Sequence, residues 1–277
     1  MTRLPESLAR YGKYVQRTKG RVVVSAIFGS YDRLTGYKKS SDEDVKFICF
    51  TDNSAIGADG WEVVEVTDSY RDPRRTAKIF KVFSTQFFPC AEAVMWIDGS
   101  CYFKRSPLKL FSECSYRSLW LYNHPDRICL YREAEVCASM GKDERGLLEE
   151  QCKRYRIAGF PEKFGLYATG CNVKPVGCSE IDALMLDWWM EIDRGSVRDQ
   201  ISFPYVLWKR PVKVGLISGS IFKSDTIGFN VHKRFRFYDR QGHRINKTLS
   251  FFGYLKLRLF LFAAKIKNVH KNIRKKR

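Results

Sequence analysis

RVVVSAIFGSYD, residues 21–32, predicts a buried β-strand followed by a turn. Its first eight residues are compact, rich in β-branched side chains and uncharged after Arg21, as is typical of a buried strand. Glycine, serine and aspartate then supply turn chemistry. The stretches 45–50 (VKFICF), 61–66 (WEVVEV) and 93–97 (AVMWI) have the same apolar character, and each predicts a further strand.

A helix is expected between the third and fourth of these strands. Asp72 is suited to cap a helix and Pro73 to occupy its first turn. The helix should run to about Phe88 and stop at Pro89. Strands alternating with a helix in this way favour parallel pairing. The sequence therefore predicts an α/β domain, Rossmann-like, with a mostly parallel central sheet flanked by helices.

Three acidic residues, Asp32, Asp52 and Asp98, fall at the ends of predicted strands. In open α/β sheets, ligands bind beyond the carboxyl ends of the strands. This coincidence indicates a nucleotide site. The alternative, for Asp32 and Asp52, is that aspartate is simply common in turns after strands.

The predicted helix carries a basic face. Arg74, Lys78 and Lys81 lie at helical spacing on one side, just before the strand that delivers Asp98. Cations that reach phosphates, beside a carboxylate that holds a divalent cation, suit a nucleoside diphosphate leaving group. A solvated basic face and a turn aspartate are the alternative.

The second half is less regular. Helices are expected at 147–157 and 180–193, and a segment 197–207 continues after Gly195. We expect Trp188 and Trp189 to belong to the core rather than to a sugar-stacking platform. The triplet Arg198–Asp199–Gln200 lies between apolar stretches, where buried polar groups need partners, and sugar hydroxyls are suitable ones.

The charge lies mainly at the ends. The chain has 277 residues with a net charge of +19, and no acid follows Asp239. We expect a polar lead-in at 1–20, one domain at 21–247 and a basic amphipathic tail at 248–277. The tail favours an anionic membrane surface over a specific nucleic acid. Without a secretory signal or a long apolar run, the sequence predicts a cytoplasmic protein, peripheral at the inner face of the membrane.

The nine cysteines are scattered and form no CxxC pair. Structural zinc sites need closely paired ligands, so we expect reduced thiols that pack in the core.

Many short motifs occur in the order of one known family. This chain resembles the DUF616 family, also called the TOD1/MUCI70 glycosyltransferase-like family, over about residues 21–210. The motifs are AIFGSYD (26–32), FICFTD (47–52), DPRRTAKIFK (72–81), WIDGS (96–100), HPDR (124–127), CLYREA (129–134), GLYATG (165–170), DWWMEI (187–192) and RDQISFPYVL (198–207).

The resemblance implies a GT-A-like fold related to glycosyltransferase family 8. It also implies transfer of a hexose from a nucleotide diphosphate sugar to a glycan or lipid-linked acceptor in cell-surface polysaccharide synthesis. By this likeness the donor binds Ala26, Phe28, Gly29, Tyr31, Asp52, Arg74, Lys78, Lys81 and Gly170, and the catalytic residues are Asp98, Asp199 and Gln200.

The resemblance further implies Mn²⁺ or Mg²⁺, with Asp98, Ser100 and His232 as ligands. Asp98 stands at the first position of a DxD motif, but Ser100 replaces the second carboxylate, and a hydroxyl is a weaker ligand. A non-catalytic sugar- or nucleotide-binding module of the same fold is one alternative function, and a basic nucleic-acid binder is another.

Overall fold

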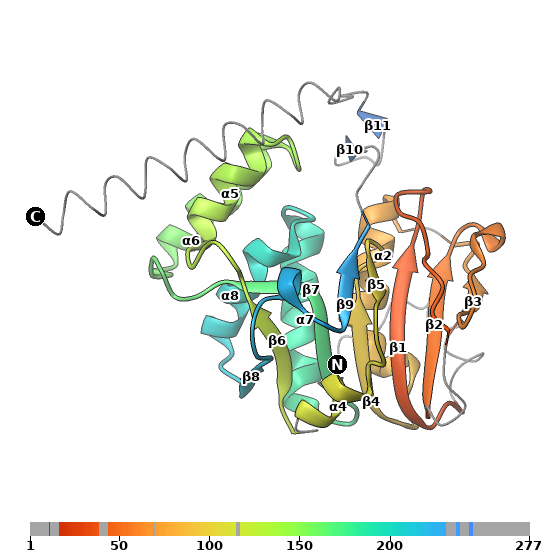
Figure 1. The fold of residues 1–277 in the computed structure, drawn as a ribbon. Coiled ribbons are helices and arrows are strands. Elements are labelled where there is room, and N and C mark those ends of the chain that lie inside the picture. Colours follow the sequence, from red (N-terminus) through yellow and green to blue (C-terminus); the bar gives the residue numbers. More distant parts are fainter. Residues whose placement is uncertain are drawn as a thin grey trace, which may run out of the picture.

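The computed structural model describes Tyr11 and residues 17–38, 44–68, 70–114 and 117–230, together with the backbone of two short strands, β10 (Phe237–Tyr238) and β11 (Arg244–Ile245) (Figure 1). Most of the predicted lead-in and the whole of the tail at 248–277 lie outside the described residues. The predicted domain boundary at 247 therefore stays a prediction. Within the described residues, no helix has the length and apolar character needed to span a bilayer.

A central sheet contains seven strands in the order β3-β2-β1-β4-β7-β6-β8, with β3 and β8 at opposite edges. Strands β3, β2, β1 and β4 are mutually parallel, and β6 and β8 are parallel to each other. Only β7 among them runs antiparallel, against both β4 and β6. The mostly parallel α/β fold is thus confirmed. The bounds are β1 Gly20–Ile27, β2 Val45–Thr51, β3 Glu62–Glu65, β4 Ala91–Ile97, β6 Leu119–Asn123, β7 Tyr167–Pro175 and β8 Val214–Leu216.

Both faces of the sheet are buried, which explains the near-continuous apolar strands. In β1, Val22 and Val24 belong to one core cluster and Val23 to the other. The first cluster packs under helices that include α2, α7 and α8, and the second under α4 and the β5–β9 pair. The remaining bounds are η2 Ser54–Ile56, α2 Pro73–Val82, α3 Ser84–Phe87, β5 Cys101–Phe103, α4 Leu108–Glu113, α5 Leu130–Ser139, α6 Arg145–Ile157, α7 Ser179–Arg194, α8 Asp199–Lys209, η3 Ile221–Lys223 and β9 Ile227–Phe229.

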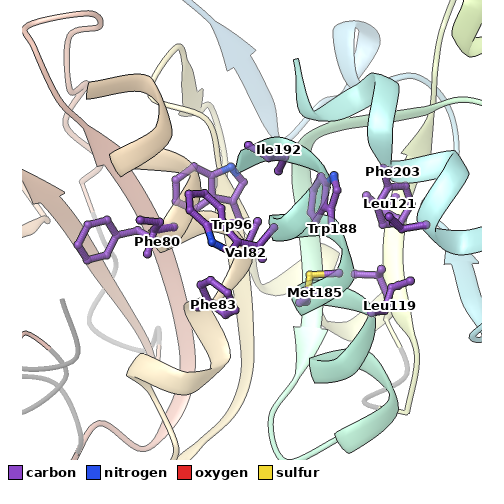
Figure 2. Close-up of a cluster of buried hydrophobic side chains, with 14 of the residues drawn as sticks. Phe80, Val82, Phe83, Trp96, Leu119, Leu121, Met185, Trp188, Ile192 and Phe203 are labelled. Carbon is purple, nitrogen blue, oxygen red and sulfur yellow. The ribbon is translucent and has the colours of Figure 1, made fainter. Parts of the chain in front are cut away.

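The largest core cluster joins the two halves of the chain. Figure 2 shows Trp96 of β4 and Trp188 of α7 in one group with side chains from α2, β6 and α8. Trp188 and Trp189 are 1% and 8% exposed, which confirms that both belong to the core. The nine cysteines are all unpaired.

The prediction of one helix over 73–88 is wrong, because the helix is shorter. It breaks at Phe83, so that α2 ends at Val82 and a short α3 follows. The fully buried ammonium group of Lys174, from β7, donates hydrogen bonds to the carbonyl oxygens of Lys81 (2.5 Å) and Val82 (3.1 Å). Those carbonyls lie at the negative end of the helix dipole, where a cation is favourable. A contact from a distant strand therefore accompanies the end of the helix.

Candidate functional site

Four charged side chains meet where β4 ends and α8 begins. Lys78 and Lys81 come from α2, Asp98 follows β4, and Asp199 is the first residue of α8. Lys81 Nζ lies 3.1 Å from Asp98 Oδ1 and 2.5 Å from Asp199 Oδ2. Lys78 Nζ lies 3.1 Å from Asp199 Oδ2 and 4.0 Å from Asp98 Oδ1. We call these four residues the Lys–Asp quartet.

Local and tertiary contacts both position the quartet. Asp72 caps α2 by accepting a hydrogen bond from the backbone N–H of Arg75 (3.0 Å), so the helix begins where the sequence predicts. The indole N–H of Trp96 donates to Asp98 Oδ1 (2.8 Å), and that of Trp188 donates to the carbonyl of Asp199 (3.0 Å). The two core tryptophans therefore fix the carboxylate of Asp98 and the backbone of Asp199 beside Lys81.

Burial and charge oppose each other in the quartet. Burial alone would raise the pKa of Asp98 and of Asp199, but the nearby lysine ammonium groups hold both pKa values below the usual range. Burial would lower the pKa of Lys81, and the two carboxylates raise it instead. At Lys78 burial prevails, and the pKa is lowered. Both acids are thus stabilised as carboxylates.

Two adjoining cavities open beside the quartet and share the wall formed by Tyr31, Lys78, Asp98, Ser100 and Arg198. The smaller cavity has a volume of about 120 Å³ and extends over the end of β1 and the start of α2. The larger one has a volume of about 510 Å³ and extends toward β7, α8 and β9. Its other lining residues are Met140, Lys142, Ala168, Thr169, Gly170, Asp199, Gln200, Ile221, Phe222, Phe229 and Asn230.

Most of the predicted site residues line these cavities. Ala26, Phe28 and Arg74 line the smaller one, Gly170, Asp199 and Gln200 the larger one, and Tyr31, Lys78, Asp98 and Ser100 both. Lys81 is fully buried behind them.

Arg74 is also engaged elsewhere, since its guanidinium donates to the carbonyl of Lys142 (3.0 Å) and lies 3.8 Å from Asp143. The solvated basic face that was the alternative for this helix is therefore not what the structure contains.

Besides the buried Lys81, two predicted donor-binding residues, Gly29 and Asp52, line neither cavity. The exposed Asp52 accepts a hydrogen bond from the backbone N–H of Gly29 (2.8 Å), so it stabilises the turn after β1. This outcome matches the plain turn role that aspartate often has. His232 lies outside the described residues.

Two glycines allow close approach of backbone to the site. A Cβ on Gly170 would lie 3.2 Å from Asp98 Oδ2, and a Cβ on Gly99 would lie 2.7 Å from the Ile27 side chain. The backbone also links these segments, because the N–H of Asp98 donates to the carbonyl of Gly170 (2.8 Å). Small residues at both positions let β4 and β7 bring Asp98 to the cavity wall.

Sequence reasoning missed Lys142 and Thr169. Lys142 follows α5 and lines the larger cavity, and Thr169 Oγ1 donates to Asp199 Oδ2 (3.2 Å). Thr169 stands inside the GLYATG motif, which could have pointed to it. Lys142 carries no local signal, because only the packing of α5 and α6 brings it there.

The described residues do not fit the predicted divalent cation well. Asp98 and Ser100 line the cavities, but within the described residues no three carboxylate, histidine or cysteine side chains are grouped to hold a metal ion. Asp98 Oδ1 already accepts from Lys81 and Trp96. The buried ammonium groups beside it neutralise the charge that would attract a cation. The metal site with His232 stays a prediction.

Known proteins resemble this chain in sequence and in structure. The chain is 29% identical over 224 residues to the "Probable hexosyltransferase MUCI70" of Arabidopsis thaliana, a match covering 69% of this chain and 38% of that protein. Mouse xyloside xylosyltransferase 1 in its apo form has a TM-score of 0.45 and 11% identity, over 72% of this chain and 85% of that one. The apo bifunctional glycosyltransferase WbbM has a TM-score of 0.42 and 10% identity, over 73% and 39%.

The family whose sequence profile matches is described as "TOD1/MUCI70, glycosyltransferase-like domain", and the match extends over residues 8–227. It includes the Lys–Asp quartet and almost all of the residues that line the two cavities. The chain belongs to this family of glycosyltransferase-like domains.

Proposed function

We propose that this protein transfers a hexose from a nucleoside diphosphate sugar to a glycan or lipid-linked acceptor in the synthesis of cell-surface polysaccharide. The observation that carries the proposal is the Lys–Asp quartet beside the wall that the two cavities share. A related protein named as a probable hexosyltransferase supports the reaction class. The GT-A fold and the kinship with glycosyltransferase family 8 are part of the same proposal.

The two cavities suit different parts of the donor. The smaller cavity, beside Ala26 and Phe28, suits the base and ribose, and the shared wall with Lys78 and Arg198 suits the diphosphate. The larger cavity suits the hexose and the incoming hydroxyl, with Gln200 available for hydrogen bonds. Asp98 Oδ2, which has no hydrogen-bond partner within the described residues, is placed to accept from a sugar hydroxyl.

In the transfer step, an acceptor hydroxyl oxygen bonds to the anomeric carbon as the bond from that carbon to the diphosphate breaks. The electron pair stays on the diphosphate, and the hydroxyl proton leaves to the departing phosphate oxygen or to water. Fixed cations aimed at the charge that develops on the leaving group stabilise this transition state.

The pKa of Asp199 is lowered although the side chain is buried, because Lys78 and Lys81 hold its charge. Asp199 is therefore a poor proton acceptor, and its role is to hold the two lysines.

The test is binding followed by turnover. Nucleoside diphosphates and their sugars should raise the melting temperature of the purified protein, because a ligand of the folded state stabilises it by mass action. The same sugars should release free nucleoside diphosphate when acceptor glycans are added. Lys78→Met should lose both, whereas Lys153→Met, which removes an exposed charge on α6, should keep both. No stabilisation by any nucleotide or sugar nucleotide would refute the proposal.

We also propose that the basic segment 248–277 brings the enzyme to the inner face of the membrane. Support comes from the sequence alone, since twelve Lys or Arg and no acid follow Asp239. Each basic residue near an anionic surface contributes about 1 kcal/mol. Replacing Lys275, Lys276 and Arg277 with serine should weaken sedimentation with phosphatidylserine vesicles. Unchanged sedimentation would contradict the proposal.

A further inference from the structure

We propose that Lys142 and Arg198 bind the leaving diphosphate and take the place of a divalent cation at this site. The inference rests on the proposed function and deepens it. It adds Lys142 to the diphosphate site that already includes Arg198, and it states the charge requirement of the reaction.

Lys142 and Arg198 have no carboxylate at ion-pair distance in the part of the chain that the structure describes. In the quartet, two ammonium groups face two carboxylates at ion-pair distance. Among the described residues, neither Lys142 nor Arg198 forms such a pair. The guanidinium of Arg198 donates to Gln200 Oε1 (3.2 Å), and its Nε is buried without a hydrogen-bond partner in the described part of the chain.

Both residues line the larger cavity, and Arg198 also lines the smaller one. A cation removed from water is costly unless an anion or several acceptors compensate it. Burial first, and then the charge of Arg198, lower the pKa of Lys142. An anion bound beside them would offset the repulsion between the two cations. Burial would lower the pKa of Arg198, but nearby acidic groups, Asp199 and Glu133 among them, raise it instead. Neither carboxylate lies at ion-pair distance from Arg198 within the described residues, so its Nε donor remains available to an anion in the cavity.

The charge of a diphosphate matches the combined charge of Lys142 and Arg198. Each phosphate of a sugar-linked diphosphate bears one negative charge at neutral pH, so the diphosphate balances one lysine and one arginine. Arginine binds phosphate oxygens through its planar fork, and lysine acts on them as a point charge. A divalent cation added to this set would leave excess positive charge beside Lys78 and Lys81.

One carboxylate oxygen of Asp98 is already engaged by protein donors. This carboxylate occupies the position where the resemblance implies a metal ligand, but Lys81 and Trp96 already occupy its Oδ1. Ser100, two residues later, offers only a hydroxyl. The charge that a metal would provide is thus supplied by side chains from the α5–α6 connection and the start of α8.

Isothermal calorimetry on the full-length protein tests the inference. The probes are uridine diphosphate and guanosine diphosphate, each titrated into metal-stripped protein in EDTA and again with excess Mn²⁺. We expect the Kd for the nucleotide that binds to differ by less than about twofold between the two conditions. Lys142→Met and Arg198→Met should each weaken binding by at least about tenfold, which corresponds to the loss of a charge-assisted hydrogen bond.

Matched variants distinguish weaker binding through loss of charge from weaker binding through loss of folding. Lys142→Arg and Arg198→Lys keep the charge and should recover part of the affinity, and Lys153→Met should bind as the unaltered protein does. Melting temperatures without ligand show whether each variant is folded. Binding that needs Mn²⁺, or unchanged binding in folded Lys142→Met, overturns this inference and leaves the proposed function standing. Absence of binding in both conditions overturns the proposed function and this inference with it.

Discussion

Lys81→Met tests how the candidate site is held together. The ammonium group lies 3.1 Å from Asp98 and 2.5 Å from Asp199, and the side chain has no exposed surface. Methionine keeps much of the volume of lysine but removes the charge. The substitution therefore leaves Asp199, whose side chain is 4% exposed, with one ammonium partner instead of two.

The expected loss of stability follows from these contacts. Removing one partner of a buried ion pair costs about 3–5 kcal/mol in general. We expect a loss of about 3 kcal/mol, at the lower end of that range. The reason is that Lys78 still lies 3.1 Å from Asp199, and the side chain of Asp98 is 35% exposed and can be hydrated.

The assay is urea unfolding at neutral pH, followed by tryptophan fluorescence. Lys153→Met, on the exposed face of α6, is the control and should change the free energy of unfolding by less than about 0.5 kcal/mol. Lys81→Met combined with Asp199→Asn should recover part of the loss, because it removes the uncompensated carboxylate. A loss under about 1 kcal/mol for Lys81→Met, or no recovery in the double variant, would refute the reasoning.

The difference between wild type and Lys81→Met should also depend on pH. Asp98 and Asp199 have pKa values lowered in the folded state, chiefly because the lysines outweigh burial. Such groups stabilise the protein above their unfolded pKa of about 4, and this stabilisation is lost as the pH falls through the folded pKa. The difference between the two proteins should therefore shrink as the pH is lowered below about 4.

Three further predictions concern the surroundings of the site. Gly170→Ala should weaken binding of a sugar nucleotide with little effect on the melting temperature, because the added Cβ would lie 3.2 Å from Asp98 Oδ2; unchanged affinity in a ligand titration would contradict this. Asp52→Ala should leave nucleotide affinity unchanged and cost about 1 kcal/mol in urea unfolding, because it removes only the hydrogen bond to the Gly29 N–H. Burial lowers the pKa of Lys174 from 10.5 to about 7, so the unfolded chain binds the extra proton between these values and this group makes stability rise with pH. In urea unfolding, the stability of Lys174→Met should not show this rise with pH. A pH profile identical to that of the unaltered protein would contradict the prediction.

Much of the fold could be predicted because its signals are local. The apolar runs at 21–28, 45–50 and 93–97 coincide with β1, β2 and β4 to within two residues, and Asp72–Pro73 starts α2 as expected. The end of that helix could not be predicted in this way, because Lys174 reaches its last carbonyls from 92 and 93 residues away. The antiparallel direction of β7 is likewise a property of the assembled sheet.

In the candidate site, too, some features follow from local sequence and others only from tertiary packing. By itself the sequence determined that Lys78 and Lys81 share a helix face and that Asp98 ends the following strand, since helical and strand periodicity decide both. Only the tertiary structure decided that Asp199, 121 residues beyond Lys78, closes the quartet and that Lys142 joins the cavity wall. The physical reason is that these meetings depend on how α2, α7 and α8 pack around Trp96 and Trp188, which no local pattern encodes.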